Sequence, residues 1–243
     1  MIFDCETYLV NQPLAAKQFG LAGLESLCRE AGVSRAIVIS EIGVQPDNKR
    51  LAELLSTYPG DKHLFRPCAW INPNFGEAAV KELEVCVRER GFVALKLMPT
   101  HHFVRLVGTL AHALMRKVQE LKIPVTIHSG TFLGHPLEIA VLANAFPDVP
   151  IIMDHMGYRY YVAEAIAAAR QAPNIHLATT AVMEPHWIRQ AVKEIGADRV
   201  LFGSNAPYVF PKTQIDVIKQ AELSDADEKK LLSENCATLF GLA

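Results

Sequence analysis

The strongest constraint on the fold is a regular alternation of short β-rich runs with longer amphipathic stretches along the 243 residues. Each repeat spans about 30 residues, enough for one strand, one helix and two short loops. An alternation of strands and helices predicts a parallel sheet with helical crossovers. The predicted strands are Ile2–Cys5, Ala36–Ser40, Leu64–Trp70, Val93–Leu97, Val125–His128, Ile151–Asp154, Ile175–Ala178 and Val200–Phe202.

The stretches between these runs have apolar residues at helical spacing. Leu51, Leu54, Leu55 and Tyr58 recur at i, i+3, i+4 and i+7, which gives a helix one apolar face. Asp47 precedes this pattern and is the expected N-cap of that helix. The predicted helices are Gly20–Ala31, Asp47–Tyr58, Glu77–Arg90, Val104–Leu121, Pro136–Ala145, Tyr161–Gln171, Pro185–Ile195, Thr213–Ala221 and, after the last strand, Asp225–Phe240.

Eight such units fit a closed barrel, and an open doubly wound sheet is the alternative. No GxGxxG motif follows the first strand, which disfavours a dinucleotide-binding sheet. The chain length matches one α/β barrel, typically about 250 residues. We therefore predict an α/β protein with one (β/α)8 TIM barrel over residues 1–243 and an extra C-terminal helix.

Composition narrows the class of partner and the compartment. The chain has 24 Lys and Arg against 26 Asp and Glu and no basic block, so nucleic acid is not an expected partner. It has no apolar run of the roughly 18–20 residues that a membrane span requires. The 5 cysteines are scattered without metal-binding spacing, which suits free thiols in the cytoplasm. The expected partner is a small-molecule substrate.

Polar side chains follow nearly every predicted strand. In a TIM barrel the carboxyl ends of the strands meet at one face, and functional groups gather there. Apolar strands that end in ionisable groups are hard to explain by packing alone, because burying unsatisfied polar groups costs free energy. The candidates, in strand order, are Asp4, Glu6, Tyr8, Ser40, Glu41, Asn72, Lys96, His101, His102, His128, Asp154, His155, Thr179, Thr180, Ser204 and Asn205.

Four segments carry a resemblance to a known family. They are Gly91–Thr100 (GFVALKLMPT), Ile123–Thr131 (IPVTIHSGT), Phe146–Gly157 (FPDVPIIMDHMG) and Asp198–Tyr208 (DRVLFGSNAPY). Together, and in this order, they resemble the amidohydrolase superfamily. The nearest branch is the amidohydrolase-2 group, relatives of aminocarboxymuconate-semialdehyde decarboxylase and of small TIM-barrel hydrolases. The resemblance spans nearly the whole chain.

The resemblance implies one divalent metal ion, zinc or manganese, at the barrel mouth. The family pattern is a His-x-His pair after strand one, histidines after strands five and six, and an aspartate after strand eight. His128 and His155 match two of these positions. Glu6 and Tyr8 stand where the paired histidines would be, and Asn205 where the aspartate would be. The expected ligands are Glu6, His128 and His155.

The remaining roles follow from chemistry and position. An amide cannot accept a proton near neutral pH, so Glu6 or His155 is the expected general base in place of Asn205. Lys96 stands among apolar neighbours, where it either binds an anionic substrate or pairs with Glu6. The expected catalytic residues are His128, His155, Asn205 and Lys96, and the expected substrate-binding residues are Tyr8, Lys96, His102 and Tyr158.

Three functions remain open from the sequence. The first is a hydrolase of the amidohydrolase-2 type that acts on a small carboxylated or cyclic ester or amide, with metal-activated water. The second is a metal-independent lactonase or decarboxylase that works by acid–base chemistry. The third is a degenerate barrel that binds a ligand without turnover, since the ligand positions are altered. Family members often form dimers, so the resemblance also leaves room for a homodimer.

Overall fold

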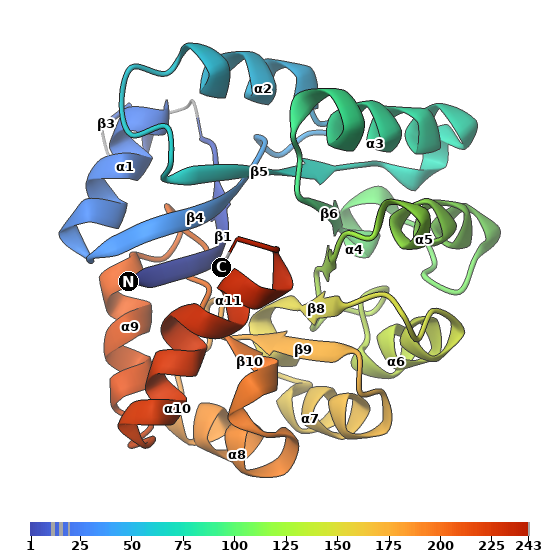
Figure 1. The fold of residues 1–243 in the computed structure, drawn as a ribbon. Helices are drawn as coiled ribbons and strands as arrows, with labels where there is room; N and C mark the ends of the chain where they lie inside the picture. The colour runs from blue at the N-terminus through green and yellow to red at the C-terminus, as the bar shows by residue number, and fades with distance from the viewer. Residues whose placement is uncertain (11–12, 15–16, 19, 243) are drawn as a thin grey trace.

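The structure is a computed structural model, which describes residues 1–10, 13–14, 17–18 and 20–242. Eight parallel strands form one sheet in the order β1-β4-β5-β6-β7-β8-β9-β10 (Figure 1). They are β1 (Ile2–Tyr8), β4 (Val33–Ile39), β5 (Phe65–Trp70), β6 (Ala94–Leu97), β7 (Val125–Ile127), β8 (Ile151–Met153), β9 (Ile175–Ala178) and β10 (Val200–Leu201). A short antiparallel pair, β2 (Pro13–Leu14) with β3 (Lys17–Gln18), follows β1.

Helices surround the ring of strands, as Figure 1 shows. They are α1 (Gly20–Glu30), α2 (Asn48–Thr57), α3 (Glu77–Arg90), α4 (Pro99–His102), α5 (Thr109–Leu121), α6 (Pro136–Ala145), α7 (Val162–Gln171), α8 (Pro185–Ile195), α9 (Pro211–Lys219), α10 (Asp225–Lys229) and α11 (Asn235–Leu239). The predicted (β/α)8 barrel is confirmed. The Asp47 side chain accepts from the Arg50 backbone N–H at 2.8 Å, as its predicted N-cap role requires.

Two predicted helices differ from the structure by more than the one or two residues seen at other helix ends. The predicted helix Val104–Leu121 begins only at Thr109, and the short helix α4 precedes it. The predicted closing helix Asp225–Phe240 is divided into α10, a π-helical turn at Lys230–Glu234 and α11. Apolar periodicity detects the helices but not such local changes in winding.

The barrel closes where β1 meets the segment that begins at β10. The backbone N–H of Cys5 donates to the Phe202 carbonyl at 2.9 Å, and that of Tyr8 donates to the Ala206 carbonyl at 2.7 Å. Pairing on both sides explains why β1 runs to Tyr8, past the predicted end at Cys5. Asp4 adds a side-chain tie, because its Oδ1 accepts from the backbone N–H of Ser204 at 2.9 Å.

Asp4 makes stability depend on pH. Burial raises the pKa of its carboxyl from 3.8 to about 7 in the folded protein. The folded state therefore holds a proton that the unfolded state releases, and stability falls as pH rises from about 4 to about 7. A shift of this size corresponds to about 4 kcal/mol.

Asp4→Asn should remove this pH dependence. The free energy of unfolding of the variant, relative to that of the wild type at the same pH, should therefore be higher at pH 8 than at pH 4. Urea unfolding at pH values from 4 to 8 measures the difference. Parallel pH profiles for the two proteins would contradict the assignment.

The core has two layers. One lies between the strands and the surrounding helices, and the other fills the barrel interior with side chains such as Phe3, Ile39 and Trp70. The C-terminal α11 covers the amino ends of the strands: Phe240, which follows it, packs on Phe3 with ring centroids 5.9 Å apart (Figure 1). The opposite end, at the carboxyl ends of the strands, is left to form the site.

Two further sequence features can be compared with the structure, namely the lack of a long apolar run and the scattered cysteines. The described part of the chain has no helix both long and apolar enough to cross a membrane. All five cysteines are buried and free, as their scattered spacing predicts.

Candidate active site

The carboxyl ends of the strands open into a cavity of about 630 Å³ on one side of the barrel mouth. The cavity brings together four of the predicted site residues, His128, His155, Tyr158 and Asn205. The full lining, from the segments after β7 to β10, is His128, Ser129, Thr131, His155, Tyr158, Arg159, Ala181, Met183, Asn205 and Val209.

A buried polar network joins the ends of three strands at this mouth. The ammonium of Lys96, from β6, is completely buried and donates to Glu6 Oε1 on β1 at 3.1 Å. It also donates to Oδ2 of Asp154, which follows β8. The Tyr8 hydroxyl donates to the same Oε1 of Glu6 at 2.7 Å. The first-strand pair Glu6 and Tyr8 therefore holds a lysine.

Charge complementarity keeps Lys96 and Asp154 ionised. Burial alone would lower the pKa of Lys96, but the Asp154 and Glu6 carboxylates outweigh burial and hold that pKa above its ordinary value. Burial alone would raise the pKa of Asp154, but the neighbouring His155, Lys96 and His128 hold it well below its ordinary value. Asp154 is therefore a carboxylate and Lys96 an ammonium across the whole working pH range.

Tyr8 stays a neutral phenol. Burial, followed by the charge of Glu6, holds the pKa of its hydroxyl well above the ordinary value. A neutral phenol is a hydrogen-bond donor and a poor metal ligand. Its hydroxyl is committed to Glu6, and Tyr8 is not among the cavity-lining residues, so its predicted contact with substrate has no support in this geometry.

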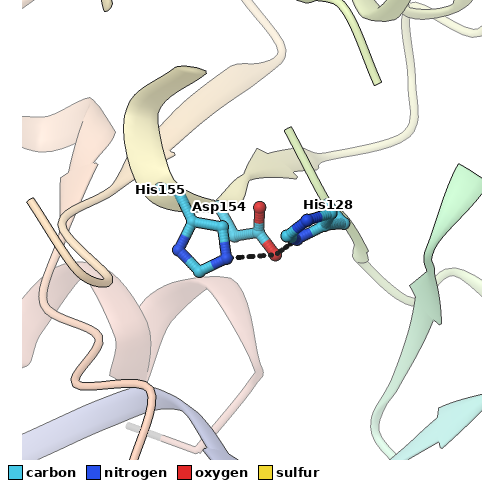
Figure 2. Close-up of side chains that lie close together, drawn as sticks. All are labelled: His128, Asp154 and His155. Atoms are coloured by element: carbon cyan, nitrogen blue, oxygen red, sulfur yellow. Dashed lines mark ion pairs between the residues drawn. The ribbon is translucent and has the colours of Figure 1, made fainter. Parts of the chain in front are cut away.

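Two histidines approach the carboxylate of Asp154 from either side (Figure 2). His128 Nδ1 lies 3.4 Å from Asp154 Oδ2, and His155 Nε2 lies 3.7 Å from the same oxygen. The two imidazole rings meet edge to face, with centroids 4.8 Å apart. Asp154 is buried, whereas 22% of the His128 side chain is exposed, which leaves that ring accessible from the cavity.

The segment that presents His155 is strained. Four consecutive residues, His155–Tyr158, have positive φ angles, and only one of them is glycine. Such backbone persists only where its surroundings hold it. Thr180 does so, because its Oγ1 accepts from the His155 backbone N–H at 2.7 Å and its carbonyl lies 2.9 Å from His155 Nδ1. A carbonyl only accepts, so Nδ1 carries the hydrogen and Nε2 is the atom turned to Asp154.

Ser129 fixes the other side of the same turn. Its backbone N–H donates to Asp154 Oδ1 at 2.7 Å, and its hydroxyl donates to the Asp154 carbonyl. The Gly157 N–H in turn donates to the Ser129 hydroxyl oxygen at 2.9 Å. Asp154 Oδ1 is thus held by the backbone, while Oδ2 is left for Lys96 and the two histidines.

Thr180→Val should loosen the turn that presents His155, because valine has nearly the same shape as threonine but cannot accept from the His155 backbone N–H. The Thr180 carbonyl next to His155 Nδ1 stays in place, so the effect reaches the ring through the backbone. The loss of a group that orients a metal-binding histidine typically weakens metal affinity by about 10–100-fold. Calorimetric titration with Mn²⁺ measures this change. Thr179→Val is the matched control, since the Thr179 hydroxyl accepts instead from the Gly203 N–H at 3.4 Å. Equal affinities in both variants would contradict the role given to Thr180.

The donor set around Asp154 fits a divalent cation. One atom each from His128, Asp154 and His155 can be chosen so that all three lie within 4.8 Å of one another. His128 Nδ1 is buried and has no hydrogen-bond partner among the described residues, so it is available as a ligand. Two imidazole nitrogens and one carboxylate oxygen are ligands that zinc and manganese both accept. We therefore assign these three side chains as the group that can hold one metal ion.

Two other predicted residues lie apart from this group. Glu6, a predicted ligand, is engaged by Lys96 and Tyr8 and does not belong to the donor set. His102 packs on Trp70 with ring centroids 5.7 Å apart and is absent from the cavity lining. Burial, with a smaller contribution from His101, lowers the pKa of His102 to about 4, so it is a neutral ring near pH 7.

The structure gives roles to two residues that the sequence prediction did not assign. Asp154 is predicted only as a polar residue at a strand end, yet it is the partner shared by Lys96, His128 and His155. Arg159 lines the cavity and lies over the Tyr158 ring, 5.8 Å from its centroid. The signal for Asp154 was its place directly after an apolar strand. Arg159 has no comparable signal, because exposed arginines are common.

Solved structures with the same fold include decarboxylases. A 2,6-dihydroxybenzoate decarboxylase from Rhizobium has a TM-score of 0.77 and 18% identity, with 99% of this chain and 98% of that chain covered. A dihydroxybenzoic acid decarboxylase from Polaromonas, solved with manganese and the inhibitor 2-nitroresorcinol, has a TM-score of 0.77 and 21% identity, with 99% and 97% covered. At such identities the likeness establishes the fold alone.

Sequence comparisons identify the family. A gamma-resorcylate decarboxylase from Polaromonas is 26% identical over 247 residues, which cover 80% of this chain and 75% of the relative. The family model described as Amidohydrolase matches residues 5–242, nearly the entire chain. The chain therefore belongs to this amidohydrolase family, as its four sequence segments predicted.

Proposed function

We propose that the protein is a decarboxylase that removes the carboxyl group of a small hydroxylated aromatic acid as CO₂. The relatives named above, which are gamma-resorcylate and dihydroxybenzoate decarboxylases, support this choice. It corresponds to the decarboxylase alternative of the sequence analysis and replaces the hydrolase as the leading function. The substrate is an anion with a flat ring, and the cavity has to suit both properties.

The observation that carries the proposal is that the cavity wall holds a permanent cation and no carboxylate. Arg159 lines the cavity beside the imidazole rings of His128 and His155, and the described lining includes no aspartate or glutamate. The carboxylate of Asp154 lies beneath this wall, buried and balanced by Lys96. Such a wall favours an anionic substrate. Tyr158, Met183 and Val209 add an apolar surface against which a ring can pack.

The reaction can be written with its atoms balanced. The substrate carboxylate takes up one proton at the ring carbon that bears it, the C–C bond breaks, and CO₂ and the protonated ring leave. The Arg159 guanidinium binds the carboxylate and orients the ring. His128 turns Nδ1 to Asp154 at 3.4 Å, so its other ring nitrogen, Nε2, is the proton donor at the ring carbon. Asn205 orients the substrate through its amide.

The metal-binding group adds a second source of positive charge. An ion held by His128, Asp154 and His155 would act as a Lewis acid on a substrate oxygen. The chain itself supplies the other requirements. Thr180 and Ser129 hold His155 and Asp154 in place, and the apolar wall limits the access of water to the ring. Asn205 lines the cavity, and its amide cannot accept a proton from water, which disfavours hydrolysis.

A substrate panel tests the proposal. The purified protein is incubated with hydroxybenzoic acids and, in parallel, with lactones and amides, after chelation and after addition of Mn²⁺. Release of CO₂ with formation of the matching phenol is the expected result. Arg159→Met should raise KM for the acid by about tenfold or more, because it removes a charged hydrogen-bond donor to the substrate. Hydrolysis of a lactone or amide, with no CO₂ from any acid, would overturn the proposal.

A further inference from the structure

A chain-supplied cation lies directly beneath the His128, Asp154 and His155 group. The Lys96 ammonium is completely buried and contacts two carboxylates from different strands, Glu6 Oε1 at 3.1 Å and Asp154 Oδ2. Buried lysines are costly unless their charge is compensated. Glu6 Oε2 is buried without a hydrogen-bond partner among the described residues.

Two carboxylate oxygens that face one enclosed cation are also the arrangement that a divalent metal ion uses. Here the position between them is filled by a lysine that no water reaches. The Tyr8 hydroxyl donates to the same Glu6 oxygen at 2.7 Å and keeps that carboxylate turned toward the ammonium. A metal ion placed between Glu6 and Asp154 would have to displace the ammonium or bear its repulsion at close range.

We propose that the Lys96 ammonium takes the place of a second metal ion, so that the site accepts one divalent cation at His128, Asp154 and His155 and none between Glu6 and Asp154. This inference rests on the assignment of the metal-binding group. It also gives the first-strand residues a role, since Glu6 contacts the lysine and Tyr8 donates to Glu6. Lys96 is thus a residue that determines metal stoichiometry.

The test is to remove the ammonium and count metal ions. Lys96→Met keeps an unbranched side chain of similar length and removes the charge. Equilibrium dialysis against MnCl₂ with elemental analysis should give one Mn²⁺ per wild-type chain and two per Lys96→Met chain. Electron paramagnetic resonance gives an independent readout: a single-ion Mn²⁺ spectrum for the wild type and a spin-coupled pair for the variant.

Two further proteins sharpen the result. The double variant Glu6→Gln with Lys96→Met removes a carboxylate along with the ammonium and should return to one Mn²⁺. Lys219→Met, which changes an exposed lysine of α9, should behave as the wild type. Thermal unfolding with and without Mn²⁺ gives a further readout. Mn²⁺ should raise the unfolding temperature of Lys96→Met more than that of the wild type. A Lys96→Met protein that folds only when Mn²⁺ is present also supports the proposal.

Several outcomes would overturn the inference. Two Mn²⁺ ions in the wild type, or none, would contradict the site as assigned. A single ion in folded Lys96→Met would show that the lysine does not exclude a second one. If Lys96→Met fails to fold both with and without Mn²⁺, the double variant decides, and two bound ions in that variant would overturn the inference. The metal count uses no substrate, so it remains valid if the protein proves not to be a decarboxylase. In the same way, a failed metal count does not decide the proposed reaction, which the substrate panel tests.

Discussion

Replacement of Asp154 by asparagine should abolish decarboxylation and destabilise the fold together. Asp154 is the carboxylate shared by Lys96, His128 and His155, and it is completely buried. The change removes the charge that compensates the buried ammonium on one side. Breaking a buried ion pair in this way typically costs about 3–5 kcal/mol. Loss of a carboxylate that orients a catalytic histidine can lower kcat by about 10⁴.

Urea unfolding at pH 7 and the rate of CO₂ release measure these two effects. The matched control is Asp216→Asn, which breaks the exposed pair of Lys212 and Asp216, whose atoms lie 3.0 Å apart. A surface pair of this kind is worth about 0–1 kcal/mol. A stable, active Asp154→Asn protein would refute the central place given to this carboxylate.

His128→Asn should leave the fold intact and stop the chemistry. Part of this side chain is exposed, with 22% accessible, and its ring is the proton donor of the proposed reaction. Loss of a general acid typically lowers the rate by about 10²–10⁴. The variant should also lose Mn²⁺ affinity, because His128 supplies one of the three side chains of the metal-binding group.

Steady-state kinetics and Mn²⁺ titration check these expectations, and circular dichroism confirms that the variant is folded. His63→Asn, at an exposed position far along the chain from the site loops, is the matched control and should match the wild type in both. Undiminished turnover in His128→Asn would remove this residue from the mechanism.

The barrel was predictable because its signals are local. Each strand is an apolar run of a few residues, and each helix shows its own periodicity, so neighbouring residues carry the information. The boundaries that differed depend on distant partners. β1 extends to Tyr8 because it pairs with the segment near Ala206, on the far side of the sequence. The π-helical turn at Lys230–Glu234 was also missed. The apolar residues on either side of it still recur at helical spacing, so the sequence pattern predicts one continuous helix.

The sequence indicated where polar groups gather, but only part of their contacts. In the structure several strand-end residues line one cavity, and His128 and His155 meet there edge to face. The two proposed partners of Lys96, a substrate anion or Glu6, could not be separated by sequence. That choice depends on whether the side chain is enclosed, and in the structure Lys96 is fully buried against Glu6. The role of Asp154 depends on the left-handed turn after it, which has no simple sequence signature.

The most direct test of the central claim follows the carboxyl carbon and the proton in one experiment. A hydroxybenzoic acid labelled with ¹³C in its carboxyl group is incubated with the protein in D₂O. We expect ¹³CO₂ and a phenol that carries one deuterium at the carbon where the carboxyl group stood, with both products absent for His128→Asn. Retention of the label in the aromatic acid, while the protein hydrolyses a lactone or amide, would contradict the claim that this barrel is a decarboxylase.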